Sequence, residues 1–304
     1  MVKELGYYPN TQARALVSGR SRIFGLIVSE ISNPSFAELI QSFEEIAADQ
    51  GYEIILTSTA QDPERMDLAV RRLVQRSVDG VAVLTFGTGD SAIAHLRKHR
   101  VPVTFIHSGE IAENEGRIQI DYRNGIRQAI EHLAALRHTR IALITGPPSL
   151  QSAIIRKDVF QQCMGELGLK VSPELIIEGD HTAKGGVRAF GALAALPERP
   201  SAVFCSNDLT AMGVIFEASN RGFQVPRDLS VVGFDDIRLA EFSVPPLTTI
   251  QMSQATLADY AFKTLRNIVE DRTAKSFELA TSLLIRKSTT FAPRHQDAVP
   301  YRVT

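Results

Sequence analysis

The feature that most constrains the fold is a regular alternation, from Ile23 onward, of short apolar segments with segments of helical periodicity. Residues 24–31 (FGLIVSEI) have the composition of a buried strand. Near-continuous apolar strands joined by single helices are typical of parallel sheets covered on both faces, so the sequence predicts an α/β fold. The first predicted helix ends at Gly51 and its apolar residues recur every three or four positions: Phe36, Leu39, Ile40, Phe43, Ile46 and Ala47.

The same pattern starts again in the second half of the chain, where strand-like segments occupy 140–146, 174–180, 201–207 and 229–235. Two successive sets of strand–helix repeats predict two doubly wound, parallel-sheet subdomains. A chain of 304 residues is long enough to give each its own buried core. Residues 294–304 are polar and include Pro300, which predicts a loose tail.

Charge and composition limit the partners of the chain as a whole. The 33 basic and 34 acidic residues leave a net charge of −1, so any contact with nucleic acid must come from a local segment. Cys163 and Cys205 lie in apolar segments and give no disulfide framework. The sequence has neither an apolar run long enough to span a bilayer nor the hydrophobic core of a signal peptide, so we expect a cytosolic protein.

The first 22 residues differ from the rest because they carry four basic residues against one acidic residue. Asn10 can cap a short helix that runs to Ser18, with Gly19 as its terminator. Such a helix is too short to be stable alone and needs a partner, and its basic charge points to nucleic acid.

Polar side chains follow several of the predicted strands, where α/β sheets bind ligands. Carboxylates accept hydrogen bonds from hydroxyl groups, amides both donate and accept, and a guanidinium offers a planar fork. Together they suit a small polyhydroxylated or heterocyclic molecule, with Phe36 as an apolar wall. The polar set is Ser29, Asn33, Asp121, Asn124, Asn207, Asp208, Asp235, Asp236 and, in the helix after GPPSLQ, Arg156.

A structural interpretation competes with the ligand-binding one. Asp and Asn after a strand are also common helix caps and turn residues, and we interpret Asp208, before LTAMG, as a cap. For Asn207 and Asp235 both interpretations stay open at this point, and Arg156 is either a ligand contact or an ordinary surface arginine.

Three further motifs are weaker. Gly87 and Gly89 resemble a dinucleotide fingerprint but follow the third strand of their unit rather than the first. His95 and His99 have metal-ligand spacing, yet a solvated helix face explains them better because no carboxylate partner is near in the sequence. No hydrolase or kinase motif occurs. We therefore expect neither an enzyme nor a metal or cofactor.

Several motifs in order resemble the lactose/galactose repressor (LacI/GalR) family over residues 5–293. The segment LGYYPN with ARAL (Ala13 to Leu16) is similar to the end of the family's DNA-binding headpiece and its hinge helix. GLIV with ISNP is similar to the first core strand and its loop. Further matches are DGV (79–81), His138 to Pro147, ND with AMG (207–213), SVVGFDD (230–236) and PPLTTI (245–250).

The resemblance implies two subdomains of the periplasmic-binding-protein type with an effector bound in the cleft between them. The chain would cross between them three times. One subdomain would comprise 23–136 with 253–281, and the other 137–252 with 282–293. Two copies are expected to pair as a homodimer.

By the family's motifs, Arg156, Asn207 and Asp235 are the expected effector contacts, while Asn124, Phe36 and His181 line the cleft. His181 stands where the family often has a stacking aromatic residue, which favours a more polar ligand. Val159 replaces a common glycine and Ser35 a frequent phenylalanine.

The resemblance also implies operator DNA as a partner. The family's helix-turn-helix would precede Leu5, so we expect the chain as given to bind operator DNA weakly. The hinge residues are Asn10, Ala13, Arg14 and Leu16, and Leu16 would wedge into the minor groove. Two alternatives are a solute-binding protein, against which the missing signal peptide argues, and an NAD-dependent enzyme that uses Gly87 and Gly89.

Overall fold

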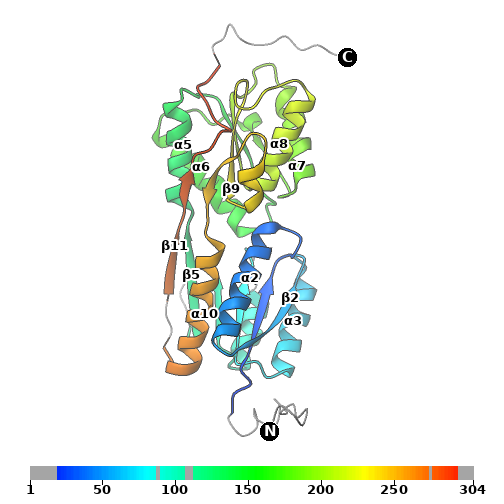
Figure 1. Ribbon diagram of the computed structural model, residues 1–304, viewed down its shortest axis with the longest axis vertical. Helices are drawn as coiled ribbons and strands as arrows, with labels where there is room; N and C mark the ends of the chain where they lie inside the picture. The colour runs from blue at the N-terminus through cyan, green and yellow to red at the C-terminus, as the bar shows by residue number, and fades with distance from the viewer. Residues whose placement is uncertain (1–18, 87–89, 107–111, 274–275, 294–304) are drawn as a thin grey trace, which may run out of the picture. The chain divides into compact units, whose positions relative to one another are not determined.

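The protein is described by a computed structural model at residues 19–86, 90–106, 112–273 and 276–293. The chain divides into two compact units. The first comprises 1–119 with 254–278, and the second 120–253 with 279–304. Each holds a six-stranded sheet within the described residues, built mainly from parallel strand pairs (Figure 1). The predicted α/β fold with two parallel-sheet subdomains is therefore confirmed. The hinge residues, Gly87, Gly89 and the tail lie outside the described residues.

The sheet of the first unit has the strand order β11-β5-β4-β3-β1-β2. Helices α2 and α10 pack side by side on one face, where Phe262 of α10 meets Phe24 and Phe43 edge-on. Helices α3 and α4 pack on a second apolar cluster that includes Ile27 and Val81. The elements are β1 (Ile23–Val28), α2 (Pro34–Asp49), β2 (Glu53–Ser58), α3 (Pro63–Gln75), β3 (Gly80–Leu84), α4 (Asp90–Lys98), β4 (Val103–Ile106), β5 (Glu115–Asp121), α10 (Gln254–Asp271) and β11 (Ser276–Ala280).

Local sequence explains where these helices begin and end. Asn33 and Asp62 cap α2 and α3 by accepting hydrogen bonds from the amides of Ser35 and Glu64, and each cap precedes a proline. Helix α2 ends before Gly51, whose φ of 72° lies in the left-handed region that glycine tolerates. The predicted end of this helix is therefore confirmed.

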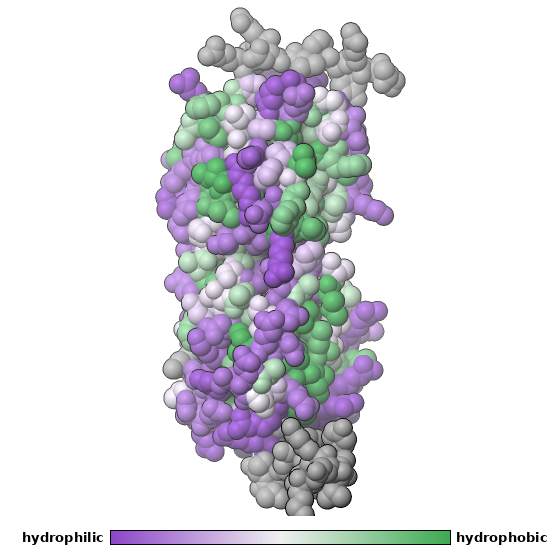
Figure 2. Space-filling model, in the orientation of Figure 1, coloured by the Kyte–Doolittle hydropathy of each residue, from purple (hydrophilic) through white to green (hydrophobic). Residues whose placement is uncertain are grey.

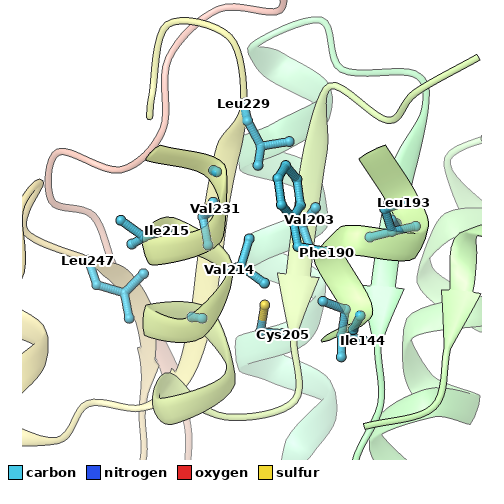
Figure 3. Close-up of a cluster of buried hydrophobic side chains, with 14 of the residues drawn as sticks. Ile144, Phe190, Leu193, Val203, Cys205, Val214, Ile215, Leu229, Val231 and Leu247 are labelled. Atoms are coloured by element: carbon cyan, nitrogen blue, oxygen red, sulfur yellow. The ribbon is translucent and has the colours of Figure 1, made fainter. Parts of the chain in front are cut away.

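The sheet of the second unit has the strand order β12-β10-β9-β8-β6-β7, and β12 pairs antiparallel with β10. Figure 3 shows its buried core, in which Phe190 of α7 and Val214 of α8 pack on Val203 of β8 and its neighbours. The elements are α5 (Tyr122–Ala135), β6 (Ile141–Ile144), α6 (Gln151–Glu166), a 3-10 turn (Pro173–Leu175), β7 (Ile176–Ile177), α7 (Ala183–Ala194), β8 (Ala202–Cys205), α8 (Asp208–Asn220), β9 (Ser230–Asp235), α9 (Arg238–Phe242), β10 (Thr248–Gln251) and β12 (Ser282–Leu284).

The boundary between the units differs from the expected one at 136. It falls within β5, between Gln119 and Ile120, so that α5 belongs to the second unit. The physical reason is packing: α5 lies against α6, β10 and β12. The sequence pattern places a helix after its strand but does not show which core that helix joins. The chain passes between the units three times, and the later passages fall at 253/254 and 278/279.

Helices α7 and α8 approach each other closely because glycines line their contact. A Cβ atom on Gly186 would overlap the carbonyl oxygen of Thr210, and one on Gly213 would overlap that of Ala183. Among the described residues, no helix is both long and apolar enough to cross a membrane.

We expect Gly213→Ala to lower the free energy of unfolding by about 1–3 kcal/mol, because the backbone of Ala183 must move to admit a methyl group. Gly165→Ala on α6 is the matched control, since open space surrounds that position. Alanine there should be neutral or stabilise by up to about 1 kcal/mol through helix propensity. Urea unfolding followed by circular dichroism measures both. Equal effects of the two substitutions would contradict the packing argument.

Candidate functional site

The candidate site lies at the carboxyl ends of the strands in the second unit. Strand β8 ends at Cys205 and is followed by Ser206 and Asn207, while the neighbouring β9 ends at Asp235. Helix α6 contributes Arg156. Because the strands are parallel, residues far apart in the sequence converge on this one edge.

Arg156 is the centre of the site, and its side chain is only 4% exposed. Its Nη1 donates to the carbonyl oxygen of Ser206 at 2.5 Å, and its Nη2 lies 3.6 Å from Oδ1 of Asp235. The guanidinium carbon lies 3.8 Å from the ring centroid of Phe234 and 5.2 Å from that of Tyr122. These aromatic faces stabilise a buried cation. The Nε of Arg156 has no hydrogen-bond partner among the described residues.

Asp235 faces this cation from the end of β9 and is 8% exposed. Burial raises the pKa of its carboxyl to about 6, and the nearby Arg156 opposes the rise. Its φ is 110°, and that of Asp236 is 58°, so two successive non-glycine residues have left-handed backbone conformations. Such conformations persist only where the surroundings hold them in place, and they cluster at functional sites.

His181 is held against the same group of residues. Its Nε2 forms a 2.9 Å hydrogen bond with Oγ of Ser206, and its ring covers Gly146 so closely that a Cβ there would overlap it. Burial, and then the charge of Arg156, lower the pKa of His181 to about 3, so the imidazole is neutral at physiological pH. A neutral imidazole offers one donor and one acceptor.

Asn207 serves two purposes at once. Its Oδ1 caps α8 by accepting from the amide of Thr210 at 2.9 Å, and its Nδ2 donates to the carbonyl oxygen of His181 at 2.9 Å. Its structural role therefore also fixes the position of His181. The two interpretations that the sequence left open are compatible for this residue.

The interpretation of Asp208 as a helix cap is wrong, because Asn207 is the cap. The carboxylate of Asp208 is fully buried and accepts from Oγ1 of Thr249 at 2.5 Å and from the amide of Ile237 at 2.9 Å. That amide follows the Asp235–Asp236 turn and needs a buried acceptor. Burial, and then the charge of Asp235, raise the pKa of Asp208 well above its usual value.

The other two residues predicted to line the cleft, Asn124 and Phe36, make their described contacts with other groups. Asn124 is near the start of α5, where its Nδ2 donates to the carbonyl oxygen of Thr281 at 2.9 Å. Phe36 belongs to the first unit, where its ring centroid lies 5.5 Å from that of Phe86. The structure thus groups Arg156, Asn207, Asp235 and His181.

Sequence reasoning missed the two aromatic residues whose rings contact Arg156. Phe234 lies inside an apolar strand, where every neighbour is also a core candidate, so no sequence signal separates it from the core. Tyr122 directly follows the predicted strand end at Asp121, a position that could have been included in the polar set.

The weaker motifs gain no support from the described residues. The rings of His95 and His99 lie 4.8 Å apart on and just after α4, but no group of three or more metal-ligating side chains occurs in the part of the chain that the structure describes.

Comparison with known proteins places this geometry in context. The sequence model of the periplasmic binding protein-like domain matches residues 130–289. The chain is 32% identical over 290 residues to the HTH-type transcriptional repressor PurR of Histophilus somni, which covers 94% of this chain and 87% of the relative. It is 33% identical over 265 residues to the ribose operon repressor of Escherichia coli, with coverages of 87% and 80%.

Solved structures of transcriptional regulators are similar to this chain as well. The lac repressor dimer bound to operator and an anti-inducer has a TM-score of 0.83 and 26% identity, covering 94% of this chain and all (100%) of the other. The complex of the transcriptional regulator CelR with cellobiose has a TM-score of 0.81 and 26% identity, covering 94% and 88%.

The raised pKa of Asp235 predicts an unusual dependence of stability on pH. The folded protein takes up a proton on Asp235 near pH 6, whereas an unfolded Asp does so near its ordinary value of about 4. The contribution of this carboxyl to stability therefore rises as the pH falls from about 7 to 4, by at most about 1.4 kcal/mol per pH unit. Relative to Asp235→Asn, whose amide mimics the protonated acid, the wild-type chain should gain stability over this range.

Asp228→Asn is the control of opposite sign. Hydrogen bonding to Arg227 lowers the pKa of Asp228, so its contribution is present at neutral pH and is lost as the pH falls through that lowered value. Urea unfolding of the three proteins between pH 8 and about pH 3 tests both, because the contribution of Asp228 is lost only below the ordinary pKa of an Asp, about 4. A wild-type advantage over Asp235→Asn that is constant with pH would refute the assignment for Asp235.

Proposed function

Because the chain belongs to the LacI/GalR family of transcriptional repressors, we propose that its core is a small-molecule sensor whose effector binds at Arg156 and Asp235. The observation that carries this proposal is the buried guanidinium in contact with the rings of Phe234 and Tyr122, whose Nε has no hydrogen-bond partner in the described part of the chain. Buried donors are almost always satisfied in proteins, so an unpaired one marks a place for a ligand acceptor or a water.

The charge of the site favours an uncharged, polyhydroxylated effector. Asp235, when ionised, neutralises Arg156, and His181 is neutral, so no excess positive charge remains for a phosphate. A carboxylate accepts from hydroxyl groups and a guanidinium donates to them. A sugar, or a nucleoside that presents ribose hydroxyls, fits this set. Two similar proteins point the same way, a ribose operon repressor and a regulator in complex with cellobiose.

The effector signal is expected to reach operator DNA, as the similar lac repressor structure binds operator. The contacts with DNA would come from the hinge residues Asn10, Ala13, Arg14 and Leu16, which lie outside the described residues. Effector binding would shift an existing equilibrium between two states of the core. Coupling of this kind amounts to about 1–3 kcal/mol.

Pairing of two copies would use apolar side chains that the second unit leaves at its surface. Leu239, Phe242 and Val244 on α9 and the following turn are 52%, 76% and 88% exposed. Hydrophobic groups are also visible on the face of this unit in Figure 2. Such a group of large apolar side chains on one short segment is typical of a protein–protein contact.

We expect a sugar or nucleoside to raise the thermal unfolding midpoint in a dose-dependent way, because it binds only the folded state. At a hundredfold excess over Kd the gain is about 2.7 kcal/mol. A panel of pentoses, hexoses, disaccharides, sugar phosphates, nucleosides and purines tests the chemical class. Stronger responses to sugar phosphates than to the free sugars would contradict the charge argument.

The substitution Arg156→Lys tests whether the effector binds at this residue, because lysine keeps the positive charge but lacks the planar guanidinium. Affinity should fall about 10- to 100-fold, the equivalent of one charge-assisted hydrogen bond. Arg227→Lys, an exposed arginine that pairs with Asp228, is the matched control and should leave affinity unchanged. If Arg156→Lys bound a stabilising ligand as tightly as the wild-type chain does, the effector site would not include Arg156.

We expect Phe242→Ser with Val244→Ser to convert a dimer into a monomer in sedimentation equilibrium at micromolar concentration, because the exposed apolar area is removed. Leu167→Ser with Phe291→Ser, two other exposed apolar residues of the same unit, serves as the control and should remain dimeric. A monomeric wild-type chain, or a control that dissociates equally, would exclude this surface.

A further inference from the structure

The amino-terminal edge of the sheet in the first unit brings two helix ends together. Strands β1, β3 and β4 are parallel, with Phe24 opposite Gly80 and Val81 opposite Val103, so all three begin at the same edge. Helices α3 and α4 run directly into β3 and β4 and pack against each other. The carboxyl ends of both helices therefore lie at this edge.

The chain enters the first unit at the same edge, and its position there is fixed. Oδ1 of Asp79 accepts from the amide and hydroxyl of Ser21 at 2.7 and 2.8 Å, and Oδ2 accepts from the amide of Arg22 at 3.0 Å. Arg22 also lies 3.8 Å from Glu270. Since Asp79 follows the end of α3, residues 19–22 run beside that helix end.

Five cations occupy the two helix ends, and we call them the basic edge: Arg71, Arg72, Arg76, Lys98 and Arg100. All five are exposed, and none of their side chains makes a hydrogen bond or ion pair among the described residues. Two of the neighbouring acids are already engaged, Asp79 as described and Glu115 with Arg97, while Glu53 is exposed at the start of β2. The net charge of the edge is positive.

Helix dipoles do not explain this clustering. A cation in the last turn of a helix is stabilised by the dipole, and this applies to every helix of the protein. Yet the last turns of α2, α6, α7, α8 and α10 carry no basic residue. The cations are concentrated where the chain from the hinge enters the core.

We propose that the basic edge binds the phosphate backbone of the DNA on which the hinge segment is placed. The proposal rests on the proposed operator binding of this chain. The nearly neutral chain has no general attraction for DNA, so the contact must be local. Asp79 fixes Ser21 and Arg22, which follow the hinge in the sequence, at the edge that carries these cations. Phosphate contacts add affinity and fix orientation without reading sequence.

The test uses the whole chain and a 24-base-pair duplex of mixed sequence, with fluorescence anisotropy between roughly 20 and 150 mM NaCl, where phosphate contacts dominate. Each lost phosphate contact lowers the slope of log K against log salt by about 0.9. Arg72→Gln with Arg76→Gln should therefore reduce the slope by about 1–2 and weaken binding several-fold at the lowest salt. Lys98→Gln with Arg100→Gln should act in the same direction.

Lys170→Gln with Lys184→Gln is the matched control, because it removes two exposed cations from the second unit. It should leave the slope unchanged. No binding by the wild-type chain at the lowest salt, unchanged slopes in both edge variants, or an equal loss in the control would overturn the proposal. The thermal response to the compound panel, measured on the same proteins, reports the effector site separately, so failure of one proposal is distinguishable from failure of the other.

Discussion

The buried charge of Arg156 is the constraint on which the candidate site of the second unit depends. Removing a guanidinium from water costs several kcal/mol unless nearby groups compensate for it. Here the compensation comes from three elements: the Ser206 carbonyl after β8, the Asp235 carboxylate at the end of β9 and the aromatic faces of Phe234 and Tyr122. These groups come from segments that are far apart in the sequence. The charge therefore requires that the ends of β8, β9 and α6 be assembled together.

A second buried acidic side chain holds these elements in their relative positions. Asp208 reaches the edge from the first turn of α8 and holds both the amide of Ile237 and the hydroxyl of Thr249. A side chain on Gly233 would overlap its carboxylate, so the strand leaves room for it. Asp208 thus holds the residue that directly follows the left-handed turn at Asp235 and Asp236. Strain of this kind is retained only when the surroundings over-determine the conformation, which makes the turn a suitable element for responding to a ligand.

The sequence was sufficient for the fold class because strand and helix periodicities are local. The predicted helix end at Gly51 follows from adjacent residues and has the expected geometry, and the caps at Asn33 and Asp62 are equally local, although Asn33 was considered as a ligand-binding residue. The domain boundary did not follow, because whether α5 packs on one sheet or the other is decided by contacts with α6 and β12 far along the chain. For the same reason Asp208 was misinterpreted: its partners Thr249 and Ile237 are 41 and 29 residues away.

Only the polar residues of the candidate site could be predicted from the sequence, and the reason is again physical. Polar residues at strand ends are visible because they interrupt apolar runs, which is how Asn207 and Asp235 were found. Aromatic residues beside a cation are not visible, since Phe234 is as apolar as its neighbours on β9. What distinguishes Phe234 is the arginine that α6 places 3.8 Å above it, across 78 residues of sequence. The polar pattern and the family resemblance both offered Arg156 as a site residue, but only the three-dimensional arrangement explains why its charge is tolerated there.

Connections from the Asp235 turn lead to the segments that join the two units. The carboxylate of Asp236 accepts from Nη2 of Arg286 at 2.6 Å and from Nε2 of Gln251 at 2.9 Å. Gln251 lies just before the passage at 253/254, and Arg286 follows the passage at 278/279. The turn is therefore hydrogen-bonded to residues near two of the three passages between the units. Coupling between distant sites needs an element with two arrangements that both sites bias, and a strained turn tied to these segments is positioned to be that element.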